Sequence, residues 1–242
     1  MVSAEYAPLL DGTRVNRMLW LGDWRHVRAA YEHARRSFQR IVVLQQYSID
    51  GWPSARGTDS FVKDMYRVAH KLPVFPLPLR FERRSPEREL DLLSRVPIAQ
   101  PLVLVATEGI SSPFAKADAL LDLVAACYPQ ATVLDMTKVR AEKLYDLLAL
   151  FERAACLVTV DSALLHLAQA VPRLPVIALI ADRPTLWHGS PQYAGQRLRV
   201  RYGDFAKRTG AIVEAIGACL VAAPAVGFGQ TPTSLGAGQL GA

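Results

Sequence analysis

Along the second half of the chain, short apolar runs alternate with longer segments in which apolar residues recur every three or four positions. The apolar runs cover 101–106, 131–136, 156–160 and 174–180 and have the length and composition of buried strands. Strands that alternate with amphipathic helices are typical of βαβ units, which build parallel sheets. The pattern therefore predicts an α/β fold, with a Rossmann-type parallel sheet in the C-terminal half.

Helical periodicity is clearest between these strands, and a last helix is predicted near 207–222. The residues expected to face the sheet are Leu120, Leu123 and Val124 in the first inter-strand helix, and Leu144, Leu147, Leu148 and Phe151 in the second.

The first half of the chain shows the same alternation less completely. A helix is expected over 24–36, a strand over 41–46 and a helix over 60–70. The Pro-rich and charged stretch 71–90 is interpreted as the connection between two domains. These elements predict an incomplete N-terminal α/β half.

The same patterns divide the chain into three parts. Residues 1–95 are expected to form a truncated α/β domain, and residues 96–223 a Rossmann-like domain. Residues 224–242 are rich in Gly and poor in aromatic residues, so a disordered tail is predicted there.

Charge narrows the choice of partners. The chain has 242 residues, with 28 Lys and Arg against 22 Asp and Glu, and 51% of its residues are hydrophobic. The basic excess is spread out and lacks the dense runs of a nucleic-acid-binding arm, so no nucleic-acid partner is expected. An anionic small molecule is compatible with this charge. Peripheral contact with a lipid surface and assembly into a homo-oligomer are left open.

The cysteines and the ends of the chain bear on its compartment. Cys127, Cys156 and Cys219 are far apart in sequence and each has apolar neighbours, which predicts three reduced, buried thiols and neither a disulfide frame nor a metal site. The first 12 residues lack the features of a signal peptide, and no apolar stretch is long enough to span a membrane. A soluble cytoplasmic protein is expected.

Asp161 and Ser162 are two polar residues between the apolar strand predicted at 156–160 and the helix predicted to follow it. Ligands bind outside the carboxyl ends of parallel strands, and a helix start there favours phosphate groups, so a phosphorylated ligand is one interpretation. The other is that both residues only cap the helix. His166 lies one turn after Ser162, an unsuitable geometry for a catalytic triad with Asp161.

A second cluster of polar residues follows the first strand of this half. Ser111 and Ser112 lie in the loop after that strand, and Lys116 comes four residues after the second serine, in the opening helix turn. Two hydroxyls and a lysine suit a diphosphate approached from the side opposite Asp161. An ordinary loop followed by a solvated lysine is the alternative.

Together these residues resemble glycosyltransferase family nine, the lipopolysaccharide heptosyltransferases, which have the two-domain GT-B fold. The stretch "DSALLHLA" resembles the donor helix motif of that family, and "SSPFAK" its hydroxyl and lysine loop. The resemblance is best over 98–205. It implies that residues 1–95 are a truncated acceptor-side domain and that residues 96–223 bind the nucleotide-sugar donor. It implies that the donor is bound by Ser111, Ser112, Lys116, Asp161, Ser162, Ala163, Leu164 and His166.

Two features depart from the family pattern. Ala163 stands where the family has glycine, which restricts close approach of a phosphate to that backbone. The chain also begins after the family's first strand, loop and helix, where the general base is expected, so no catalytic residue is assigned. Asp135, after the second strand of this half, is a weak candidate for a ribose contact.

The resemblance implies a metal-independent glycosyltransferase without a cofactor. It would transfer a sugar, plausibly heptose, from a nucleotide-diphospho-sugar such as ADP-heptose to a saccharide or glycolipid acceptor. Two alternatives remain open at this stage: a non-catalytic module that binds a nucleotide-sugar, and a fragment of a longer enzyme that lacks the base.

Overall fold

A five-stranded parallel sheet forms the centre of the fold in this computed structural model, which describes residues 2–3, 19–20, 26–39, 80–98, 101–109, 113–182 and 195–223. The strands follow the order β4-β3-β5-β6-β7, and every neighbouring pair is parallel. Their bounds are β3 Leu102–Ala106, β4 Thr132–Asp135, β5 Cys156–Val160, β6 Val176–Ile180 and β7 Gln196–Arg201.

Apolar side chains on both faces explain why the central strands are buried. All five residues of β3, β5 and β6 are buried. Alternate residues point to opposite sides, so Leu102 and Leu104 belong to one core cluster while Val103 and Val105 belong to the other. A strand that is apolar on both faces requires helices on both sides.

The predicted parallel sheet is confirmed, and the structure adds a strand that the sequence interpretation missed. In β7 the partly buried Leu198 and the buried Val200 alternate with three exposed arginines. That alternation is the signal of a half-buried edge strand, and it was present in the sequence.

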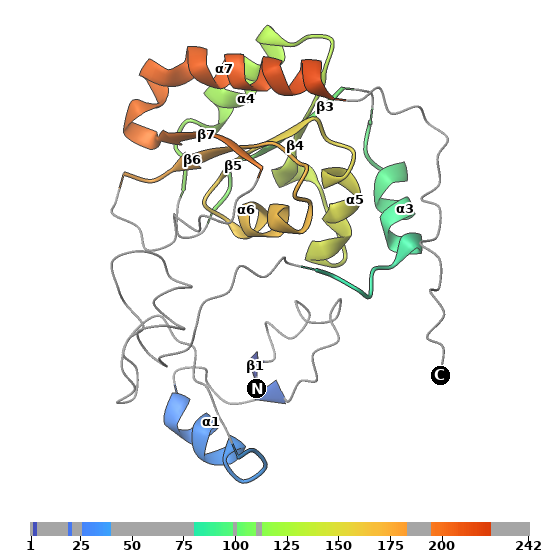
Figure 1. The fold of residues 1–242 in the computed structure, drawn as a ribbon, viewed down its shortest axis with the longest axis vertical. Coiled ribbons are helices and arrows are strands. Elements are labelled where there is room, and N and C mark those ends of the chain that lie inside the picture. Colours follow the sequence, from blue (N-terminus) through green and yellow to red (C-terminus); the bar gives the residue numbers. More distant parts are fainter. Residues whose placement is uncertain are drawn as a thin grey trace, which may run out of the picture.

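One face of the sheet is covered by α4 (Ala117–Cys127) and α7 (Phe205–Ala222), which lie above the strands in Figure 1. The hydroxyl of Tyr128 donates a 2.5 Å hydrogen bond to the carbonyl oxygen of Val213 in α7. A Cβ atom on Gly217 would lie 2.8 Å from the Tyr128 hydroxyl oxygen. Glycine at this position therefore allows the close approach of Tyr128 to α7.

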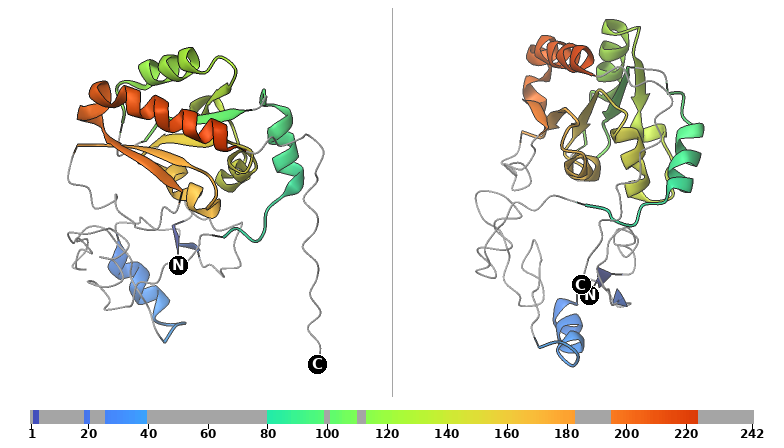
Figure 2. Two further views of the ribbon diagram at one scale, coloured as in Figure 1. Left: turned by 45° about the horizontal axis from the view of Figure 1, so that its top comes forward. Right: turned by 45° about the vertical axis from the view of Figure 1, so that its right-hand side comes forward.

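The other face is covered by shorter elements, which lie on the side of the sheet away from α7 (Figures 1 and 2). The helix predicted from the apolar repeat at 144–151 forms as one 3-10 turn followed by a single α-helical turn. Short 3-10 segments also follow β4 and β7. The bounds are α3 Pro86–Ser94, η3 Met136–Lys138, η4 Leu144–Leu147, α5 Leu148–Phe151, α6 Ala163–Leu167, η5 Ala168–Ala170 and η6 Tyr202–Asp204.

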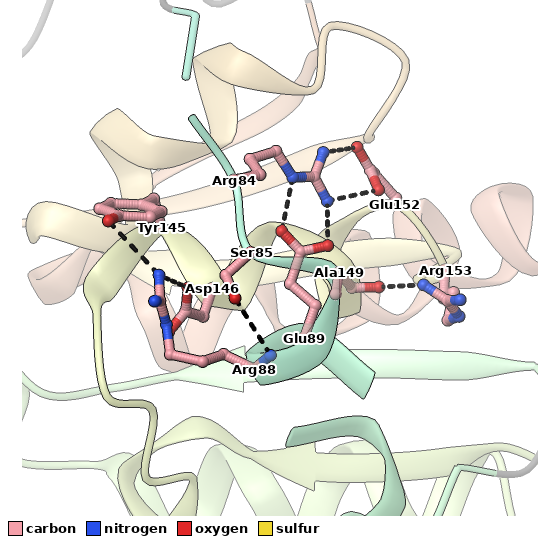
Figure 3. A network of polar contacts seen from close by, with 9 residues as sticks. All are labelled: Arg84, Ser85, Arg88, Glu89, Tyr145, Asp146, Ala149, Glu152 and Arg153. Atoms are coloured by element: carbon pink, nitrogen blue, oxygen red, sulfur yellow. Dashed lines mark hydrogen bonds and ion pairs between the residues drawn. The ribbon is translucent and has the colours of Figure 1, made fainter. Parts of the chain in front are cut away.

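Two arginines attach α3 and the residues before it to this face (Figure 3). Arg84 pairs with Glu89 at 2.6 Å and with Glu152 at 2.5 Å. Arg88 donates to the Asp146 carboxylate at 2.9 and 3.1 Å. Hydrogen bonds to Glu152 and then to Glu89 raise the pKa of Arg84, although burial acts in the opposite direction. Both guanidinium groups therefore stay charged.

Asp146 is the most enclosed member of this network, with a side chain only 1% exposed. Its carboxylate also accepts a 3.0 Å hydrogen bond from the backbone N–H of Lys143. The contact between Arg88 and Asp146 and the burial of Leu92 hold α3 against the core on this face of the sheet. Part of the stretch interpreted as a connection therefore packs against the C-terminal half. The division after residue 95 stays a prediction.

Less of the N-terminal half is described. The helix predicted over 24–36 is confirmed by α1 (Val27–Ala34), and β1 (Val2–Ser3) pairs in parallel with β2 (Leu19–Trp20). The strand expected at 41–46, the helix expected at 60–70 and the tail at 224–242 lie outside the described residues.

The cysteine prediction holds for two of the three thiols. Cys156 and Cys219 are buried in the core between the sheet and α7, and neither forms a disulfide. Cys127 is exposed, so its prediction as a buried thiol was wrong. It is the last residue of α4, where the helix turns a side chain outward despite apolar neighbours in sequence. Among the residues described, no helix is long and apolar enough to cross a bilayer.

Candidate functional site

The order of the strands marks one crevice at the carboxyl edge of the sheet. β3 pairs with β4 on one side and with β5 on the other, so the chain turns one way after β3 and the opposite way after β4. Ligands of open α/β sheets bind at such a switch point, outside the carboxyl ends of the strands. The ends that meet here are Ala106 in β3 and Val160 in β5.

A cavity of about 390 Å³ opens at this crevice. Its wall combines apolar side chains with carboxylates and hydroxyls, the mixture typical of a small-molecule site. The lining residues come from the segments that follow β3, β4 and β5, and from η4. They are Ala106, Glu108, Gly109, Met136, Thr137, Leu144, Asp161, Ser162, Ala163 and Leu164.

Asp161 combines a nearly buried carboxylate with a position on the cavity wall. Its side chain is 7% exposed, whereas that of His166 is 47% exposed. The His166 Nε2 atom lies 3.9 Å from Asp161 Oδ1, which is beyond a direct hydrogen bond and forms an ion pair only when the imidazole is protonated. The pair therefore lies at the cavity but does not have the geometry of a proton relay.

Ser162 is the N-cap of α6, as the sequence predicted. Its backbone is extended, and its hydroxyl oxygen accepts a 3.3 Å hydrogen bond from the N–H of Leu164. The helix is shorter than expected, because α6 ends at Leu167 and continues as a 3-10 turn. So short a helix carries a small dipole, which weakens the expected attraction of its start for phosphate. Ala163 and Leu164 follow the cap and also line the cavity.

Asp135 has a structural role that limits its availability to a ligand. Its Oδ1 atom accepts hydrogen bonds from the Thr137 N–H at 3.0 Å and from the Thr137 hydroxyl at 2.7 Å. Its Oδ2 atom lies 3.3 Å from Lys138 Nζ. Burial raises the pKa of Asp135, but these contacts outweigh it and the pKa is lowered. The expected ribose contact stays a prediction, and Asp135 is absent from the cavity wall.

The second cluster expected from the sequence is only partly described. Lys116 is exposed at the start of α4, with its Nζ atom 5.8 Å from the centre of the Phe205 ring. It is not among the residues that line the cavity. Ser111 and Ser112 lie outside the described residues. The structure therefore brings Asp161, Ser162, Ala163 and Leu164 together in one wall, with His166 beside them.

Several cavity residues were not identified from the sequence. Glu108 is exposed directly after β3, and Met136 and Thr137 start the turn after β4. Their position after predicted strands was a usable signal, since parallel strands bring their carboxyl ends to one edge. Leu144 had been assigned only to the core. Over the described ranges, no three His, Cys, Asp or Glu side chains are grouped so that they could hold a metal ion.

Comparisons with known proteins find a likeness in fold to a solved structure but no match in sequence. No protein-family model matches the chain, and no curated protein sequence matches it. A solved structure, that of the E. coli ADP-heptose LPS heptosyltransferase II, is similar with a TM-score of 0.42 and 16% sequence identity. The likeness covers 67% of this chain and 61% of that one, so this chain spans less than two thirds of the similar protein.

Proposed function

We propose that this chain binds a nucleotide-diphospho-sugar and transfers its sugar, plausibly heptose, to a saccharide or glycolipid acceptor. The cavity at the β3 and β5 crevice carries the proposal, since it lies at the switch point of a parallel sheet. The "DSALLHLA" stretch, through which the chain resembles heptosyltransferases, provides four of its lining residues.

The chemistry of the wall suits the uncharged part of such a donor. Met136, Leu144 and Leu164 offer an apolar surface, and the cavity is of the size that small-molecule sites have. The nearly buried Asp161 carboxylate would repel a phosphate at close range, so the diphosphate is placed toward Lys116 and the loop before it. Lysine at that point would stabilise the charge of the departing nucleoside diphosphate.

Binding is tested by calorimetric titration with ADP, AMP and adenosine. We expect ADP to bind more tightly than AMP or adenosine, because the proposed lysine contact is to the diphosphate. Lys116→Ala should weaken ADP binding by about 1.5–3 kcal/mol, the usual value of a hydrogen bond to a charged group. Equal affinity for adenosine and ADP would reject the diphosphate contact.

Transfer is tested by release of ADP from ADP-mannose and from ADP-heptose with a lipopolysaccharide core acceptor. Asp161→Asn should lower donor affinity or turnover about tenfold, a change of about 1.4 kcal/mol. Its melting temperature should change little, since asparagine keeps the size of the side chain and the N-cap of α6 is Ser162, which this substitution leaves in place. Asp122→Asn, an exposed acid on α4, is the matched control. Donor binding without transfer would leave a binding module as the function.

A further inference from the structure

Two carboxylates from different strands border the same cavity. Glu108 follows β3 and is exposed, and Asp161 follows β5 and is nearly buried. Glu108 makes no hydrogen bond or ion pair with any described residue. None of the described residues that line the cavity is a lysine or an arginine. The described residues therefore leave the oxygens of the Glu108 carboxylate to a ligand.

The other polar groups of the wall also offer acceptor oxygens. The Thr137 hydroxyl gives its proton to Asp135, which leaves lone pairs on its oxygen. The Ser162 oxygen accepts from the Leu164 N–H and keeps its own proton to donate. An ionised carboxylate only accepts. The wall is thus rich in acceptors, and it suits a ligand group that donates hydrogen bonds and carries no negative charge.

Asp135, the acid at the end of the neighbouring strand, does not serve this purpose. Its two carboxylate oxygens contact Thr137 and Lys138 and hold the turn after β4. Glu108 and Asp135 therefore differ in role although each follows a strand end. Of these two acids, Glu108 lies on the cavity wall and Asp135 does not.

We propose that Glu108 is a specificity-determining residue that binds vicinal hydroxyl groups of the ligand, either those of the nucleotide ribose or those of the donated sugar. Two adjacent O–H groups can donate to the two oxygens of one carboxylate. The hydroxyl-bearing part of the ligand then lies inside the cavity, and its phosphates lie outside it, away from both acids. This inference rests on the proposed function, because it names the part of the donor that the cavity recognises.

The test compares Glu108→Gln with the parent chain in calorimetric titrations. The probes are ADP, 2′,3′-dideoxy-ADP, ADP-mannose, D-ribose, D-mannose and the diamine putrescine. Glutamine keeps the size of the side chain but replaces one acceptor oxygen with a donor. Asp122→Asn is the control for loss of an exposed negative charge elsewhere, on α4, and unchanged melting temperatures show that each variant is folded.

We expect Glu108→Gln to weaken binding of the hydroxyl-bearing probe about tenfold or more, since the lost bond is to a charged acceptor. If the ribose is recognised, the parent binds dideoxy-ADP weakly and the substitution no longer matters for that probe. If the donated sugar is recognised, the substitution affects ADP-mannose and leaves ADP unchanged. Asp122→Asn should change neither affinity.

Other outcomes overturn the inference or separate it from the proposed function. If Glu108→Gln binds ADP more tightly than the parent chain, the phosphates lie beside Glu108. If the substitution lowers the affinity for every nucleotide equally, or for none, Glu108 has no role in hydroxyl recognition. Binding of putrescine that depends on Glu108 would show a cation site instead. If the parent binds no nucleotide but binds ribose or mannose through Glu108, the proposed function fails and this inference stands. If it binds no probe, both fail.

Discussion

The two faces of the sheet are built in different ways. One face is covered by two regular helices of 11 and 18 residues. The other face is covered by α3, short 3-10 turns and helices of four or five residues. The two acids that are buried within the described ranges, Asp146 and Asp161, lie with the short elements.

This difference suits the two faces to different roles. Long helices satisfy their backbone internally and present continuous apolar stripes, so the α4 and α7 face is suited to stabilising the sheet. In short helices and turns, a larger share of the backbone N–H and C=O groups lies at the ends and is not paired within the element. Here these elements also bring polar side chains to the carboxyl edge of the strands. The cavity lies on this irregular side, at the ends of β3, β4 and β5.

The largest loss of stability is expected from a substitution in the core beneath α4 and α7, on the regular face of the sheet. Ile216 in α7 is fully buried, so Ile216→Ala should lower the free energy of unfolding by about 2–5 kcal/mol through lost packing and a residual cavity. Urea denaturation measures this change. Val221→Ala on the same helix is the control, because Val221 is 90% exposed and its loss should cost less than about 0.5 kcal/mol. A loss of ADP affinity without a loss of stability would contradict the division between the faces.

A smaller effect is expected where α3 joins the irregular face. Asp146→Asn removes the charge that binds Arg88 and should lower the free energy of unfolding by about 1.5–3 kcal/mol, as for hydrogen bonds to charged groups. Asp91→Asn removes an exposed partner of Arg95 and should cost at most about 0.5 kcal/mol. If neither substitution changes the free energy of unfolding measured by urea denaturation, α3 is held by its apolar contacts alone.

The turn after β4 should make stability depend on pH. The pKa of Asp135 is lowered in the folded chain, so its stabilising contribution is complete above the unfolded value of about 3.9 and is lost as the pH falls through the lower folded value. Asp135→Asn should cost about 1 kcal/mol at pH 7, and the difference from the parent should shrink below about pH 4. Thermal unfolding between pH 2.5 and 7 measures this, and a constant difference would exclude the charge as its cause.

The smallest perturbation uses the cysteines as probes of the regular face. In the folded chain a thiol reagent should modify Cys127 alone, because Cys156 and Cys219 are buried between the sheet and α7. All three should react in denaturant. Rapid modification of Cys219 under native conditions, detected by mass spectrometry, would show that α7 opens more readily than its packing indicates.

The elements that could be predicted from the sequence are those with a clear pattern of apolar residues. The strands β3, β5 and β6 are continuous apolar runs between turn signals, and all of them were predicted. Strand β7 was missed because the alternation of arginine with Leu198 and Val200 was not recognised as a strand pattern. Burial of Cys127 was wrongly predicted because apolar neighbours in sequence do not fix the direction of a helical side chain.

The position of the candidate cavity followed from local sequence signals, whereas several of the residues that line it did not. Asp161 and Ser162 could be found because they end an apolar strand and begin a helix, a local signal. Glu108 and Met136 gained importance only when the strand order placed the ends of β3, β4 and β5 around one cavity. Sequence could not show that Asp135 is occupied by its own turn, because that depends on side-chain geometry.

The central position of β3 affects how the chain folds as it is synthesised. β3 is the first strand of this sheet to leave the ribosome, yet one of its two partners, β5, begins only at Cys156. Until then one edge of an entirely apolar strand has no partner within the sheet, a state prone to mispairing. The candidate crevice between the ends of β3 and β5 also needs both strands, so it forms late. Slowed translation before Cys156 would therefore prolong exposure of β3, and chaperone binding is expected to be strongest over that interval.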